Sequence, residues 1–247
     1  MLGTTQFLIF ELGQFCNLGS WHPKCPNMSR TPTGPTRLTD DQIIQSIHEA
    51  RDKFNFTGLV GWHYYNEPMI EHKRMYDIMQ TCGGRYILWT NGKIQPKDDR
   101  IGLFEKIIVS QYDDEELHMD YYYGETERYP YKGCNNVRFI RPRFDSRLKD
   151  ASKNMPNNHR CFRQHIEMII DNWGTSHLCC QDWRGEIGMG NIHEVSFESL
   201  VRLRDVILTH MFVENSPDRC NRCREKMNKL VLLDEEPYRR AIEKWGS

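Results

Sequence analysis

Strand-like and helix-like segments alternate through the first half of this chain, and the alternation narrows its fold more than any other feature. Short apolar runs that we interpret as strands lie at 6–12, 58–65, 85–90, 106–111 and 136–143. One helical segment begins at the capping-box sequence Thr39-Asp40-Asp41-Gln42, and a second spans 69–81. Repeated strand–helix units favour a parallel sheet or barrel, whose ligand site lies at the carboxyl ends of its strands.

Composition and charge limit the class of protein and its partners. The 247 residues suffice for a full hydrophobic core, and the net charge of −1 offers no surface suited to nucleic acid or an anionic membrane. No apolar run approaches the ~20 residues that cross a bilayer. The first residues lack a secretory signal, so we expect a cytoplasmic protein. In that compartment nine cysteines indicate metal ligands or buried thiols rather than disulfides.

A loop directly after the first strand carries two thiols and an imidazole, Cys16, His22 and Cys25, spaced Cys-x5-His-x2-Cys. These residue types at this spacing are typical of ligands for one metal centre. The sequence around them, a strand followed by Cys-Asn-Leu and later by Cys-Pro, resembles the cluster loop of radical S-adenosylmethionine (SAM) enzymes. The resemblance implies a [4Fe–4S] cluster, SAM as cofactor and a 5′-deoxyadenosyl radical that abstracts hydrogen from a substrate.

Members of that family hold the cluster with three cysteines, and this loop supplies two. His22 is the preferred third ligand, because imidazole is an established iron–sulfur ligand. A different alignment puts Met28 at the third position, where a thioether would bind iron poorly. In a third alternative, His22 only packs within the loop and ligates nothing.

Three further stretches resemble SAM-binding positions of the family. Asn66-Glu67-Pro68 is similar to the Gly-Gly-Glu-Pro turn after the second strand, although Tyr65 and Asn66 replace its glycines. The resemblance implies that Asn66 and Glu67 receive the SAM ammonium, and that Asn91 of Thr-Asn-Gly and Ser110 also bind SAM. On the second strand, His63 is a candidate proton donor or acceptor, and a packed core histidine is about as good an interpretation.

The second half of the chain holds most of the remaining cysteines, within a helix-like stretch that begins at Cys161 and the loops after it. Gly-x4-Cys-Cys-x-Asp, then Gly-Asn-Ile, then Cys-x2-Cys resembles the SPASM/twitch extension of radical SAM enzymes. The ligands of an auxiliary [4Fe–4S] cluster implied by this resemblance are Cys161, Cys179, Cys220 and Cys223. Cys180 is an alternative to Cys179, and four thiolates alone would equally suit zinc.

Together these features predict an α/β protein. Residues 1–150 would form a partial (β/α) barrel of radical SAM type, and residues 151–247 a small twitch-like domain with a C-terminal helix. The expected function is reductive cleavage of SAM and hydrogen abstraction from a small organic or peptide substrate, with a flavodoxin- or ferredoxin-type electron donor. The alternative is a degenerate family member that binds a structural cluster or zinc and acts as a partner protein.

Overall fold

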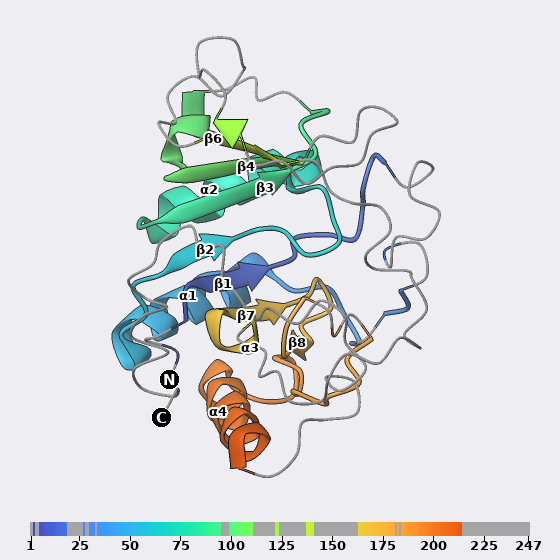
Figure 1. Ribbon diagram of the computed structural model, residues 1–247, viewed down its shortest axis with the longest axis vertical. Coiled ribbons are helices and arrows are strands. Elements are labelled where there is room, and N and C mark those ends of the chain that lie inside the picture. Colours follow the sequence, from blue (N-terminus) through green and yellow to red (C-terminus); the bar gives the residue numbers. More distant parts are fainter. Residues whose placement is uncertain are drawn as a thin grey trace.

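The computed structural model describes residues 2, 5–18, 27, 30–32, 34–94, 99–110, 122–123, 137–140, 163–180, 182 and 184–213. These residues form one eight-stranded sheet in the order β5-β6-β4-β3-β2-β1-β7-β8 (Figure 1). The strands are β1 (Phe7–Phe10), β2 (Leu59–Gly61), β3 (Tyr86–Thr90), β4 (Lys106–Ser110), β5 (Tyr122–Tyr123), β6 (Val137–Ile140), β7 (Glu167–Ile170) and β8 (Ser176–His177).

The six inner strands all pair in parallel, and β5 and β8 add antiparallel edges. In the middle of the sheet Leu8 of β1 lies opposite Val60 of β2 on one side and Met168 of β7 on the other. The predicted α/β class with a mostly parallel sheet is therefore confirmed. Because parallel strands point the same way, the carboxyl ends of β1, β2, β3, β4 and β7 lie at one edge.

The helices lie mainly on one face of this sheet. They are α1 (Asp40–Phe54), α2 (His72–Cys82), α3 (Arg163–Ile166) and α4 (Phe197–Val213), with 3-10 turns η3 (Pro68–Glu71) and η4 (Asp99–Leu103). Figure 1 shows α1 and α2 behind the sheet and α4 beyond the β7 strand. No helix of the described ranges is long and apolar enough to span a bilayer.

The predicted capping box forms as expected at the start of α1. The Thr39 hydroxyl accepts from the Gln42 amide at 3.2 Å, and the Gln42 side chain accepts from the Thr39 amide at 3.0 Å. These reciprocal bonds satisfy two backbone groups that a helix start leaves open. Helical spacing then turns Ile43, Ile47 and Ala50 toward the sheet, where all three are fully buried.

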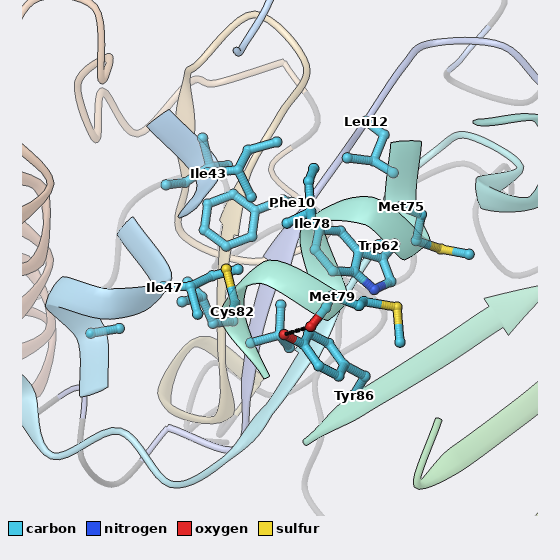
Figure 2. Close-up of a cluster of buried hydrophobic side chains, with 14 of the residues drawn as sticks. Phe10, Leu12, Ile43, Ile47, Trp62, Met75, Ile78, Met79, Cys82 and Tyr86 are labelled. Carbon is cyan, nitrogen blue, oxygen red and sulfur yellow. Dashed lines mark hydrogen bonds between the residues drawn. The ribbon is translucent and has the colours of Figure 1, made fainter. Parts of the chain in front are cut away.

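The main core lies between the sheet and α1 and α2 (Figure 2). Trp62 stacks on Tyr86 at 5.9 Å between ring centroids, and the Phe10 ring, tilted to the indole, lies 6.4 Å from it between centroids. Tyr86 reaches the end of α2, where its hydroxyl donates to the Gly83 carbonyl at 2.6 Å. The opposite face of the sheet carries a much smaller apolar cluster, in which Ile87 is completely buried.

Two elements differ from the sequence-based expectation. The strand predicted over 58–65 ends at Gly61, so His63 lies in the loop after β2 rather than on a strand. The helix-like stretch from Cys161 is described only as α3, and it passes directly into the strand β7. Local sequence contains no helix breaker there; the strand forms because Glu167–Ile170 pairs with β1 and is buried. Residues beyond the predicted boundary at 150 thus join the same sheet, and the division into two domains stays a prediction.

Candidate functional site

The carboxyl ends of the parallel strands gather several of the residues that the sequence marked. Cys16 follows β1, His63 to Glu67 follow β2, Asn91 follows β3, and Ser110 ends β4. Residues brought together here are up to about ninety positions apart in the chain. The parallel topology places them at one edge, where ligands of open α/β sheets bind.

Glu67 joins two of the predicted motifs through its buried carboxylate. One oxygen accepts from the Thr90 hydroxyl at 2.6 Å and the Met69 amide at 3.1 Å, and the other accepts from the Asn91 amide at 2.7 Å. Only 2% of the residue is exposed, and this burial raises the pKa of the carboxyl, while the three hydrogen bonds oppose the rise. Glu67 therefore fixes the turn after β2 against the end of β3.

Asn91 links this pair of turns to the cysteine loop. Its side-chain amide donates to the Asn17 side chain at 2.7 Å and lies 4.0 Å from the Cys16 sulfur as a donor. The Glu67 amide also donates to the Phe15 carbonyl at 2.9 Å. The structure thus brings Cys16, Glu67 and Asn91 into one hydrogen-bonded group.

Asn66 and Ser110 have roles within the same edge. Asn66 closes the turn after β2, since its side chain accepts from the Tyr64 amide at 3.0 Å and donates to the Trp62 carbonyl at 3.2 Å. The Ser110 hydroxyl accepts from the Trp89 indole at 2.9 Å. In the turn after β2, hydrogen bonds of the Asn66 side chain thus hold a backbone that the Gly-Gly-Glu-Pro turn forms with glycines.

His63 lies on the sheet face opposite the main core. Its ring contacts Trp89 at 5.0 Å between centroids, and a Cβ added to Gly61 would be 3.3 Å from the imidazole, so the glycine makes room for the ring. Desolvation lowers the pKa of His63 to about 4, and no described residue hydrogen-bonds with its buried Nδ1. At neutral pH the ring is uncharged, which suits a hydrogen-bonding or basic role rather than that of an acid.

A buried ion pair at the same edge was not anticipated from the sequence. Arg30 binds the Glu11 carboxylate with both terminal nitrogens, at 2.6 and 2.8 Å. Glu11 also accepts from the amides of Tyr65 at 3.1 Å and Asn172 at 3.3 Å. A single carboxylate directly after an apolar strand was the only signal in the sequence, and it did not identify the partner.

The hairpin of β7 and β8 carries the candidate auxiliary ligands Cys179 and Cys180. The Tyr65 hydroxyl donates to the Cys180 carbonyl at 2.6 Å, and the Cys180 amide donates to the Glu167 carboxylate at 2.7 Å. In the Gly-Asn-Ile sequence, the side-chain amide of Asn191 donates to the Trp173 carbonyl at 3.0 Å and so holds the hairpin turn. The hairpin that bears these cysteines is therefore attached to the loop after β2.

Most of the predicted metal ligands lie outside the described residues. They are His22, Cys25, Cys161, Cys220 and Cys223, together with the alternative Met28. Cys16, Cys179 and Cys180 are described, and none of them forms a disulfide with another described residue. In the described part of the chain no group of three His, Cys, Asp or Glu side chains is arranged to hold a metal ion. Neither set of ligands is tested by this arrangement.

Comparison with solved structures identifies the fold. No protein-family model matches the sequence, and no curated protein does. The crystal structure of BtrN in complex with AdoMet and 2-DOIA matches with a TM-score of 0.59 and 17% sequence identity, over 92% of this chain and 98% of BtrN. BtrN in an open conformation matches over the same shares, with a TM-score of 0.58 and 19% identity. The chain has the fold of BtrN.

The three hydrogen bonds of Glu67 make a prediction for stability. In Glu67→Ala three buried donors lose their acceptor, so the free energy of unfolding should fall by at least about 2 kcal/mol. Glu67→Gln keeps part of the acceptor set and should lose less. Urea unfolding measures both variants against Glu49→Ala, which removes local contacts on one helix, with Lys53 at 3.2 Å and Gln45 at 2.9 Å, and should change stability by less than about 1 kcal/mol. Equal stability of Glu67→Ala and wild type would contradict this role.

The lowered pKa of His63 makes a prediction for pH dependence. The unfolded state takes up a proton near pH 6.5 that the folded state refuses until about pH 4, so stability falls as the pH drops through this window. In His63→Gln the loss of unfolding free energy between pH 7 and pH 5 should shrink by about 1–2 kcal/mol. Urea unfolding at the two pH values measures it, with the exposed His48→Gln as control. An unchanged loss in His63→Gln would show that the ring titrates normally.

Proposed function

We propose that this chain is a radical SAM enzyme, which binds a [4Fe–4S] cluster and SAM at the carboxyl edge of its sheet. One observation supports the proposal most strongly: Cys16, Glu67 and Asn91 come from three separate motifs of the family resemblance, and they meet in one hydrogen-bonded group. The fold shared with BtrN, whose crystal structure holds AdoMet, supports it independently.

Cys16, His22 and Cys25 would hold the cluster. The described part of the site fits this assignment, because Cys16 offers a sulfur ligand and the Asn91 amide donates toward it, as hydrogen bonds to cluster sulfurs do. When bound and reduced, the cluster would supply the electron for reductive cleavage of the SAM sulfonium bond. Cys16, in the loop that Asn91 holds, would place the cluster at the carboxyl edge of the sheet.

The remaining residues would shape the SAM and substrate sites. The Glu67 carboxylate holds the turn after β2, and we propose that Asn66 and Glu67 of this turn would receive the SAM ammonium. Neutral His63, cradled by Gly61, would offer a nitrogen to a polar group of the bound ligands. The substrate class we propose is a small organic molecule, or a peptide, oxidised or rearranged after loss of one hydrogen atom.

An auxiliary cluster would complete the enzyme. Its proposed ligands are Cys161, Cys179 (or Cys180), Cys220 and Cys223, in a twitch-like region that follows a partial (β/α) barrel. Four protein ligands would leave this cluster to exchange electrons with the reaction rather than to bind substrate. A flavodoxin- or ferredoxin-type protein would deliver the first electron.

Anaerobic reconstitution with iron and sulfide tests the proposal. We expect about eight irons per chain and release of 5′-deoxyadenosine when SAM and a reductant are added. Cys16→Ala should lose about four irons and all SAM cleavage. Cys82→Ala is the matched control, because Cys82 is a buried thiol packed against the main core and lies on no candidate site.

The outcome also separates the alternatives. About four irons, or zinc alone, with no 5′-deoxyadenosine would overturn the enzyme and favour a degenerate member that binds a structural metal. His22→Ala tests the third ligand, and we expect it to behave as Cys16→Ala does. An intact first cluster in His22→Ala would remove His22 from the ligand set and leave the rest of the proposal standing.

A further inference from the structure

The Arg30 side chain contacts two carboxylates and three aromatic rings at the candidate site. Its two terminal nitrogens bind Glu11 at 2.6 and 2.8 Å, and one of them lies 3.4 Å from the Asp171 carboxylate. The side chain of Arg30 is 2% exposed, and those of both carboxylates are completely buried. Such a fork-to-carboxylate contact fixes orientation as well as distance.

Three aromatic rings surround the guanidinium. Its central carbon lies 4.9 Å from the Tyr64 ring centroid, 5.7 Å from that of Tyr65 and 5.1 Å from that of Trp173. Rings at these distances attract a cation and exclude water from it. Tyr64 and Tyr65 belong to the loop after β2, and Trp173 belongs to the hairpin turn after β7. The guanidinium therefore joins two separate loops around the end of β1.

Glu11, the partner of Arg30, reaches the same two loops through backbone groups. It accepts from the Tyr65 amide and from the Asn172 amide. Along the chain, Glu11 lies five residues before Cys16, and Tyr65 lies two residues before Glu67. Contacts with the Arg30–Glu11 pair are therefore close in the chain both to Cys16 and to Glu67, two residues of the proposed SAM site.

A buried ion pair is weak evidence of net stabilisation, because its charges lose their hydration and an apolar pair often serves as well. The geometry of this pair instead suits a role in positioning the chain segments that it contacts. Neither residue lies within hydrogen-bond distance of Cys16, Glu67 or Asn91 in any contact described for them, so the pair acts through the chain segments that it holds.

We propose that Arg30 is a positioning residue of the SAM site: with Glu11 it sets the segment of Cys16 against the turn of Glu67. The inference rests on the proposed function and adds a residue outside every motif of the family resemblance. It predicts that loss of the pair weakens metal and SAM binding even where the fold is retained.

Four variants separate positioning from folding. Arg30→Met leaves the Glu11 charge buried and unpaired, so it should melt at a lower temperature than wild type. The double variant Glu11→Gln with Arg30→Met removes both charges and should recover most of that melting temperature. Arg30→Lys keeps the charge but loses the fork. Arg85→Met is the matched control, since it removes a bidentate pair with Glu105 that lies exposed at 2.6 and 2.7 Å.

The measurements are the melting temperature, the iron retained after anaerobic reconstitution in the presence of a chelator, and the dissociation constant for SAM. We expect the double variant to bind SAM and retain iron roughly ten- to a hundredfold more weakly than wild type, the usual effect of losing a group that orients metal ligands. Arg30→Lys should bind SAM and retain iron more weakly than wild type but better than the double variant. Arg85→Met should match wild type in both measurements.

Each failure has its own signature. If wild type retains iron and binds SAM and the recovered double variant does so equally well, the role of Arg30 is overturned and the proposed function stands. If wild type itself binds neither the cluster nor SAM, the proposed function fails, and the inference that rests on it fails as well.

Discussion

The carboxyl edge of the sheet depends on the hydrogen bonds of one buried carboxylate, that of Glu11. It lies directly after β1, is completely buried, and accepts from Arg30, from the Tyr65 amide and from the Asn172 amide. An unpaired charge in such a place would be very costly, and here donors from three segments of the chain pair with it. The loops after β1, β2 and β7 are thereby held in fixed relation.

The two faces of the sheet carry apolar clusters of very different size. The face covered by α1 and α2 holds the large core around Phe10, Trp62 and Tyr86, which stabilises the sheet. The other face holds only a small apolar cluster and His63 above Gly61. The larger apolar core therefore lies on one face, and Cys16 and Asn91 meet at the carboxyl edge of the sheet.

Sequence patterns predicted the elements whose causes are local. The capping box of Thr39 and Gln42 and the apolar spacing behind it were sufficient to locate α1. The strand β7 was missed because its burial comes from pairing with β1, which no local pattern contains. The end of β2 was misplaced because Trp62 to Tyr65 are strand-like residues, whereas the Asn66 side chain folds the backbone into a turn.

The candidate site was predicted in the same uneven way. Short motifs with family resemblance pointed to Cys16, Glu67 and Asn91, and the structure brings these three together. The Arg30–Glu11 pair could not be predicted, because nineteen positions separate its members and their aromatic surroundings come from two further loops. The bonds of Glu67 also depend on the approach of β3 to β2, so its bracing role was not visible in the sequence.

The central claim is that this edge of the sheet holds a cluster ligated by Cys16 beside Asn91. Anomalous diffraction at the iron absorption edge, from crystals of anaerobically reconstituted protein with SAM, tests it most directly. The account predicts an iron site bonded to the Cys16 sulfur, with one iron of that cluster bound to the amine and carboxylate of SAM. Iron or zinc found only near Cys179, with Cys16 unligated, would contradict it.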